Sequence, residues 1–170
     1  MPVIAFVSPK GGAGKTTAAL LLALELAHAG RRVRVIDADP NQPLARWSRD
    51  GGAALGLDIV GEIDEARVPV AISSAVAVAG WVIVDTEGAA VTAAAHAIAA
   101  ADLVVIPSGP SALDAQEAVK AVALVRVAER RLGRNISHAA LLTRLPAAIR
   151  SKALKAMVEE LLCQGVAILP

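Results

Sequence analysis

The residues with the clearest chemical potential are the eight from Lys10 to Thr17, which read Lys-Gly-Gly-Ala-Gly-Lys-Thr-Thr. They follow an apolar run, Val3 to Val7, and open a long segment rich in Ala and Leu. Glycine tolerates φ/ψ values that other residues avoid, so such a loop can aim backbone N–H groups at an anion. The N-terminus of the following helix adds unpaired N–H groups and a positive dipole. The order of strand, loop and helix predicts a phosphate-binding loop, against the alternative of a glycine-rich turn that binds nothing.

The side chains of this loop predict a nucleotide site for ATP and Mg²⁺. Lys15 is expected to reach the β- and γ-phosphates, and the Thr16 hydroxyl is expected to ligate Mg²⁺. The general pattern is G-x-x-x-x-G-K-[ST], but Pro9 stands where the first glycine should be, and a second lysine, Lys10, opens the loop. This substitution indicates a variant of the phosphate-binding loop.

Carboxylates follow two later apolar runs. Asp85 ends a run of apolar residues in the Walker B arrangement, which predicts a carboxylate beside the metal, acting through a Mg²⁺-bound water. Gly88, close behind it, could bring a backbone N–H to the γ-phosphate. Asp37 and Asp39 stand two apart, so in an extended segment both could face the metal and the attacking water. The alternative for this pair is loop capping, because Asp is common in turns and Asp39 precedes Pro40.

The remaining sequence predicts the elements that position these groups. Short β-rich apolar runs alternate with longer Ala/Leu-rich runs, which is typical of βαβ units around a parallel sheet. Strands are predicted over 3–7, 32–37, 57–60, 81–85, 102–106, 139–143 and 166–169. Helices are predicted over 15–29, 43–49, 64–78, 90–100, 112–132 and 147–163, with Ser111 and Asp114 as a capping box. We therefore expect one domain, residues 1–170, with a three-layer α/β P-loop fold: a mostly parallel, twisted sheet with helices on both faces.

Composition limits the other classes of function. With 55% hydrophobic and 19% charged residues, the chain is typical of a compact globular protein. Phe6, Trp47 and Trp81 are its only aromatic residues, so a base-stacking platform for single-stranded nucleic acid is not expected. Cys163 is the only cysteine, which excludes an intrachain disulfide and a Cys-based metal site. No signal peptide or membrane segment is recognised, and we expect a cytoplasmic protein.

The motifs resemble those of the ParA/MinD group of deviant-Walker ATPases, whose loop reads K-G-G-x-G-K-T-[ST] with Lys10 at the signature lysine position. The resemblance covers nearly the whole chain through the segments 10–17, 37–40, 85–88, 106–114 and 141–144. Within the group, the segment 39–47 is similar to short ParA partition ATPases and to the VirC-type ATPases of DNA transfer. Two departures stand out: Glu87 replaces a neutral residue or proline, and the chain ends at Pro170 where relatives continue through a further helix. The family's C-terminal helix is therefore expected to be lacking.

The resemblance implies a role for each site residue. ATP closes two subunits face to face, and Lys10 of each reaches the phosphates bound by the other. Lys10, Lys15 and Asp39 are then catalytic, with Asp39 orienting or activating the attacking water, while Thr16, Asp37 and Asp85 serve the metal, Asp37 from its outer shell. The implied nucleotide contacts are Lys10, Gly11, Gly12, Ala13, Gly14, Lys15, Thr16, Thr17 and Gly88, with Thr143 and Arg144 near the adenine. Residues 107–111 would border the nucleotide and the dimer face; the alternative is a proline-stiffened turn.

The basic residues are unevenly distributed, although the formal net charge is only +1. Nine of the 17 lie between Ala118 and Lys155, where Glu129 is the only acidic residue. Arg126, Arg130 and Arg134 share one face of a helix, which predicts a basic patch that neutralises DNA phosphates without reading bases. The alternative is an ordinary solvated helix surface.

These observations favour an ATP-dependent dimeric switch that binds DNA nonspecifically and hydrolyses ATP slowly, for plasmid or chromosome partitioning or DNA transfer. Its partners would be a second copy, DNA and a stimulating protein of the ParB or relaxosome type, with no membrane, and its place would be the nucleoid. The alternatives are a MinD-like positioning regulator without DNA binding, and an ATP-dependent metabolic synthetase on the same scaffold. One cysteine excludes the iron–sulfur carriers of the superfamily, and the absence of tyrosine excludes the bacterial tyrosine kinases. The sequence does not identify the stimulating partner or the DNA locus.

Overall fold

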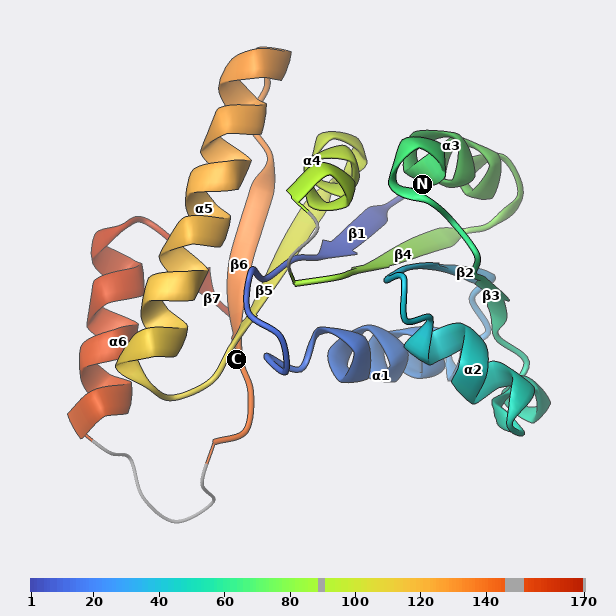
Figure 1. Cartoon of the computed structure of the whole chain (residues 1–170), viewed down its shortest axis with the longest axis horizontal. Helices are drawn as coiled ribbons and strands as arrows, with labels where there is room; N and C mark the ends of the chain where they lie inside the picture. The colour runs from blue at the N-terminus through green and yellow to red at the C-terminus, as the bar shows by residue number, and fades with distance from the viewer. Residues whose placement is uncertain (89–90, 146–151, 170) are drawn as a thin grey trace.

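A computed structural model describes residues 1–88, 91–145 and 152–169, and it contains one seven-stranded sheet in the order β3-β2-β4-β1-β5-β6-β7 (Figure 1). Every strand pair is parallel. The strands are β1 Val3–Phe6, β2 Val33–Ala38, β3 Asp58–Val60, β4 Trp81–Thr86, β5 Leu103–Ser108, β6 Ser137–Leu142 and β7 Ala167–Ile168. The predicted α/β class is confirmed, with a sheet that is parallel throughout.

Helices cover both faces of the sheet, which gives the three predicted layers. Helices α1 (Lys15–His28) and α2 (Pro43–Arg49) lie on one face. The other face carries α3 (Val68–Val78), α4 (Val91–Ala100), α5 (Ala112–Leu132) and α6 (Lys152–Cys163). Two short 3₁₀ turns, Gly52–Leu55 and Glu65–Arg67, complete the described elements. Within the described residues, no helix is both long and apolar enough to cross a bilayer.

The core forms two apolar layers, one on each side of the sheet. In the central strand β1, Val3 and Ala5 face the layer under α3 to α6, whereas Ile4 and Phe6 face the layer under α1. In β4, Ile83 likewise points opposite to its neighbours Val82 and Val84. A strand buried on both faces needs apolar residues at every position, which explains why these strands read as continuous apolar runs.

The predicted strands differ from the observed ones by one or two residues at their ends, and the larger differences occur at helix ends. The helix predicted from residue 64 begins as a 3₁₀ turn and becomes α-helical at Val68, where Pro69 occupies the first turn and lacks an N–H that a helix interior would need. The capping box of α5 is confirmed, because the Ser111 side chain and the Asp114 side chain each accept from the other's backbone N–H. Residues 147–151 and 90, predicted to begin two helices, lie outside the described residues.

The strand order brings the loops that carry the predicted site residues together at the carboxyl ends of the strands. β1 lies between β4 and β5, so the chain passes to β2 on one side of β1 and crosses to β5 on the other. Ligands of open parallel sheets bind at the carboxyl ends of the strands beside such a change of direction. Asp85 is in register with Phe6 of β1 and with Asp37 of β2, so the loops after these three strands begin at the same level.

Replacing Ile83 by Ala should remove a side chain that is 0% exposed at the centre of the sheet. We expect a loss of about 2–5 kcal/mol in the free energy of unfolding, because the cavity can only partly collapse. Val70→Ala, at a position 67% exposed on α3, is the control and should cost less than about 0.5 kcal/mol. Urea unfolding measures both values, and equal losses would contradict the assignment of Ile83 to the core.

Candidate functional site

The loop between β1 and α1 has the backbone of a phosphate cradle. Gly12 (φ +72°) and Gly14 (φ +94°) take left-handed conformations that disfavour any side chain. Gly14 is also the N-cap of α1, and no side chain caps the N–H groups of the first turn. These N–H groups and the positive end of the helix dipole are therefore directed at the loop, as an anion site requires.

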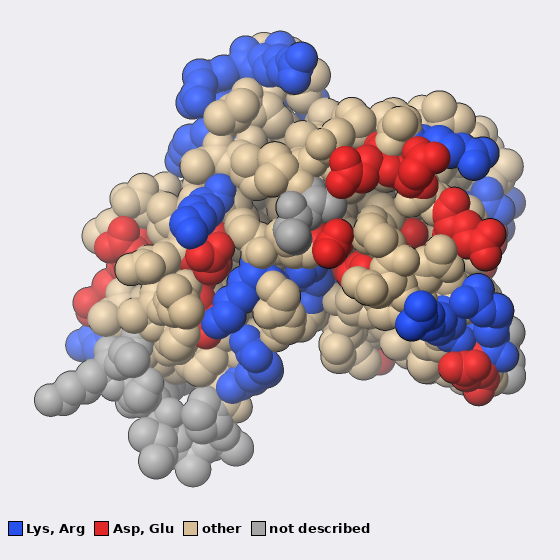
Figure 2. Space-filling model, in the orientation of Figure 1, with Lys and Arg blue, Asp and Glu red and all other residues tan. Residues whose placement is uncertain are grey.

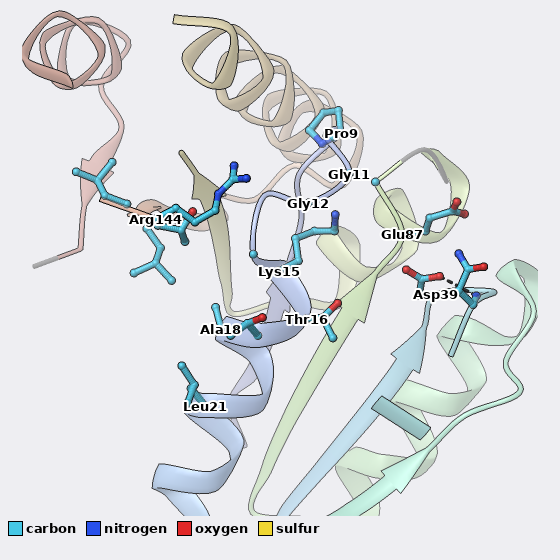
Figure 3. Close-up of a pocket in the computed structure, with 17 residues that line it drawn as sticks. Pro9, Gly11, Gly12, Lys15, Thr16, Ala18, Leu21, Asp39, Glu87 and Arg144 are labelled. Carbon is cyan, nitrogen blue, oxygen red and sulfur yellow. Dashed lines mark hydrogen bonds between the residues drawn. The ribbon is translucent and has the colours of Figure 1, made fainter. Parts of the chain in front are cut away.

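A pocket of about 840 Å³ opens beside this loop at the carboxyl edge of the sheet. This volume lies within the range of about 300–1,000 Å³ usual for small-molecule sites. Figure 3 shows Lys15, Thr16, Asp39 and Glu87 around one end, and Ala18, Leu21 and Arg144 toward the other. The pocket lining includes ten of the predicted site residues: Gly11, Gly12, Gly14, Lys15, Thr16, Thr17, Asp39, Gly88, Thr143 and Arg144. It also includes Ala18, Leu21, Asn41 and Glu87, which the motifs did not assign to nucleotide binding.

Lys15 is the buried cation of the site, with only 6% of its surface exposed. Its Nζ donates to the backbone oxygen of Lys10, 3.3 Å away, which holds it along the loop. Burial lowers the pKa of Lys15, and the negative charges of Asp85, Asp39 and Glu87 act in the opposite direction. A cation is thus held among carboxylates at the polar end of the pocket.

Asp85, at the end of β4, is fully buried, and neither carboxylate oxygen has a hydrogen-bond partner among the described residues. Burial raises its pKa to about 7, and the Thr16 hydroxyl partly offsets this effect. An orphaned carboxylate next to a threonine hydroxyl is a hard oxygen donor set of the kind that Mg²⁺ takes. In the described part of the chain, no group of three or more acidic, His or Cys side chains could hold a metal.

The two aspartates after β2 have different surroundings. Asp37 is buried, and its Oδ2 accepts the N–H groups of Leu44 and Ala45 at 2.9 Å each, so it anchors the start of α2. Burial raises the pKa of Asp37, while these backbone hydrogen bonds lower it. Asp39 lines the pocket, and its Oδ1 accepts the N–H of Asn41 at 2.8 Å. Both aspartates therefore accept backbone N–H groups of the following residues, as the loop-capping alternative predicts. Of the two, only Asp39 also lines the pocket.

Lys10 does not line the pocket; it is paired with α5 of its own chain. Its Nζ lies 2.6 Å from Oδ1 of Asp114, a residue only 5% exposed. Asp114 also accepts the N–H and hydroxyl of Ser111, and Arg144 lies 3.7 Å away. Burial alone would raise the pKa of Asp114, but the hydrogen bonds from Lys10 and Ser111 bring it below its usual value. No sequence pattern links Lys10 to Asp114, which are 104 positions apart.

Close backbone contacts hold the loops of the site together. The Thr143 hydroxyl donates to the Ala13 oxygen at 2.8 Å, which ties the end of β6 to the phosphate loop. A Cβ on Gly88 would lie 3.0 Å from the backbone N of Gly11, so a side chain would be crowded where the segment after β4 crosses the loop. These contacts bring Thr143 and Gly88, both predicted site residues, against the loop.

A parallel sheet whose central strand leads into a two-lysine phosphate loop, with a buried aspartate after the neighbouring strand, defines a P-loop nucleotide-binding protein of the deviant-Walker class. The family described as "VirC1 protein" matches residues 1–168, and the chain belongs to it. The predicted ParA/MinD membership is thereby confirmed.

The chain is similar to a curated relative in sequence and to solved structures in fold. The chain is 37% identical over 169 residues to Protein ParA of Rhizobium radiobacter, covering 99% of this chain and 76% of that protein. It resembles in fold the ATP complex of a Cyanothece McdA variant, with a TM-score of 0.77 and 20% identity over 100% of this chain and 82% of the other. It resembles equally the cobyrinic acid a,c-diamide synthase of Mycobacterium smegmatis with ADP and magnesium, with a TM-score of 0.77 and 19% identity over 96% and 82%.

Asp85→Asn should change how stability depends on pH. The folded protein holds the Asp85 proton up to about pH 7, whereas the ordinary pKa is 3.8, so the stability of the parent protein should fall as pH rises through this interval. The amide cannot ionise and should remove this fall. Without nucleotide or Mg²⁺, urea unfolding should find the variant more stable than the parent at pH 8, with a smaller gap at pH 5. Asp50→Asn, at an exposed site, is the control, and equal stability of Asp85→Asn and parent at pH 8 would refute the assignment.

Proposed function

We propose that this protein binds ATP with Mg²⁺ and hydrolyses it as a dimeric switch that acts on DNA in partitioning or DNA transfer. The observation that carries the proposal is a buried cation beside a buried carboxylate: Lys15 of the phosphate loop lines the pocket, and the charge of the unpartnered Asp85 behind it acts on Lys15. The relationship to Protein ParA and the VirC1 family supports the biological setting. The nucleotide and magnesium named for the structures of similar fold support the cofactors.

Each residue then has a role that follows from its position. Lys15 binds the β- and γ-phosphates, Thr16 and Asp85 hold Mg²⁺, and the backbone of Gly88 donates to the γ-phosphate. Bound Mg²⁺ would neutralise charge on the phosphates. Asp39, at the pocket rim, orients the attacking water. The end with Leu21, Leu141, Leu142, Thr143 and Arg144 receives the adenosine, since it is the less polar end of the pocket.

Lys10 acts on the second subunit in this proposal. Its ammonium group is held by Asp114 in the single chain, so it must leave that carboxylate before it can reach another subunit's phosphates. In the closed dimer it would supply positive charge to the transition state, as an arginine finger does. Leu113, exposed beside the segment 107–111, belongs to the same surface and is suited to burial in a dimer.

The proposed DNA surface is narrower than the sequence alone predicts. Arg126 donates to the Gln164 oxygen at 3.3 Å, and Arg134 donates to the Ala99 and Ala101 oxygens at 2.8 and 3.0 Å, so both stabilise the ends of other helices. Arg130 and Arg131 are exposed and have no hydrogen bond or ion pair in the described structure. Figure 2 shows Lys and Arg side chains gathered over the far end of α5. Arg150 and the side chain of Lys152 lie outside the described residues.

Lys15→Ala and Lys10→Ala should separate nucleotide binding from dimer closure. Without Lys15, the affinity for ATP should fall by about 100-fold or more, because the phosphates lose a charge-assisted hydrogen bond in a buried site. Lys10→Ala should change the affinity less than about threefold, but should abolish ATP-dependent dimerisation. Calorimetry and size-exclusion chromatography with ATP and Mg²⁺ measure the two effects, with Lys120→Ala as the control. Equal loss of affinity in both variants would show that Lys10 serves its own subunit.

Arg130→Ala combined with Arg131→Ala should weaken DNA binding of the ATP-bound protein equally for all duplex sequences. Removing one arginine that neutralises a phosphate should reduce the slope of log affinity against log salt by about 1, so we expect a change of about 2 for the pair. Fluorescence anisotropy at several salt concentrations measures this slope. Arg46→Ala combined with Arg49→Ala removes the same charge from α2 and is the control. If the parent protein with ATP fails to bind DNA at low salt, the positioning regulator without DNA binding becomes the better explanation.

A further inference from the structure

Glu87 follows β4 between Asp85 and Gly88 and lines the polar end of the pocket. Figure 3 shows its carboxylate on the same side of the pocket as Asp39 and away from Ala18 and Leu21. The charge of Glu87 is one of those that act on Lys15, so the two side chains are electrostatically coupled. Glu87 therefore lies where the proposed function places the terminal phosphates.

No direct contact neutralises the negative charge of Glu87 in the described structure, although this charge acts at longer range on Lys15. Asp114 has Lys10 as its partner, and Asp37 accepts two backbone N–H groups, whereas Glu87 takes part in no hydrogen bond or ion pair among the described residues. Its side chain is half-buried, so water screens it less than a fully exposed carboxylate. An incoming anion would thus meet a carboxylate that no cation neutralises directly.

The backbone at Glu87 also has little freedom to move away from the phosphate loop. The adjacent Gly88 passes so close to the phosphate loop that an added Cβ would lie 3.0 Å from the Gly11 nitrogen and 3.1 Å from the Pro9 oxygen. The backbone that carries Glu87 is thus held against the loop that would carry the phosphates. A third phosphate group adds negative charge at this end of the site, while a diphosphate leaves that place empty.

We propose that Glu87 is a specificity-determining residue that weakens the binding of a nucleoside triphosphate relative to a diphosphate. The inference rests on the proposed ATP function. It adds a residue that sets the balance between the triphosphate-bound and diphosphate-bound states. At a given ratio of the two nucleotides, a chain with a neutral residue at position 87 would hold more triphosphate, and Glu87 keeps a larger fraction of subunits in the diphosphate state.

The test compares Glu87→Gln with the parent protein by calorimetry, using a non-hydrolysable ATP analogue and ADP, each with Mg²⁺. We expect the amide to raise the affinity for the ATP analogue about tenfold and that for ADP less than about threefold, the size of a partly screened charge interaction. Glu87→Asp keeps the charge and should keep the parental ratio of affinities. Glu25→Gln, an exposed position on α1 outside the pocket, is the matched control and should change neither affinity.

Added salt gives a second readout: it should reduce the difference in affinity for the ATP analogue between Glu87→Gln and the parent, because screening weakens the repulsion that only the parent has. Equal changes for the two nucleotides in Glu87→Gln would overturn the proposal. A weaker affinity for the ATP analogue in that variant would also overturn it, since Glu87 would then hold a cation that binds the triphosphate. If the parent bound neither nucleotide, the ATP function itself would fail, and that result is distinct from an unchanged ratio in a protein that binds both.

Discussion

The burial of Asp85 is the constraint to which the rest of the site is adapted. A carboxylate removed from water with no hydrogen-bond partner loses much of its solvation, and its pKa rises to about 7. The neighbouring groups act against this cost: Lys15 lies close enough to stabilise the charged form, and the Thr16 hydroxyl does the same. A cation bound between Asp85 and phosphate would complete this balance. In the proposed function, the binding of metal and nucleotide would therefore be coupled, because each would offset a charge that is buried in a low-dielectric environment.

The scaffold holds these charges in place through contacts between loops far apart in the sequence. Asp85 is in register with Phe6 and Asp37, so the backbone pairing of the sheet alone aligns the ends of β1, β2 and β4. Gly88 then crosses the phosphate loop at van der Waals distance, and Thr143 binds the loop from the opposite side. Each contact involves the backbone of the phosphate loop, so the segments after β4 and β6 hold this loop in place.

The sequence predicted local features well and long-range pairings poorly. The phosphate loop, the capping box at Ser111 and the positions of the strands follow from spacing and periodicity over a few residues, and all three agree with the structure. The partner of Lys10 could not be predicted, because α5 is brought to the loop only by the crossover connections of the sheet. The helix-face argument for the basic patch likewise could not anticipate that Arg126 and Arg134 cap other helices. Charge patterns along a chain do not specify which acceptors the fold places beside them.

The anchoring of α2 by Asp37 also gives the protein an optical property. Trp47 lies on this helix, and its ring is packed so closely over Gly52 that an added Cβ would lie 2.5 Å from it. The chain contains no tyrosine and only one other tryptophan, Trp81, which is the first residue of β4 and so lies at the amino end of that strand. Its ultraviolet fluorescence therefore comes from two places only. Trp47 belongs to α2, which Asp37 anchors to the end of β2 beside the pocket. Its fluorescence can therefore report on the position of that helix in solution.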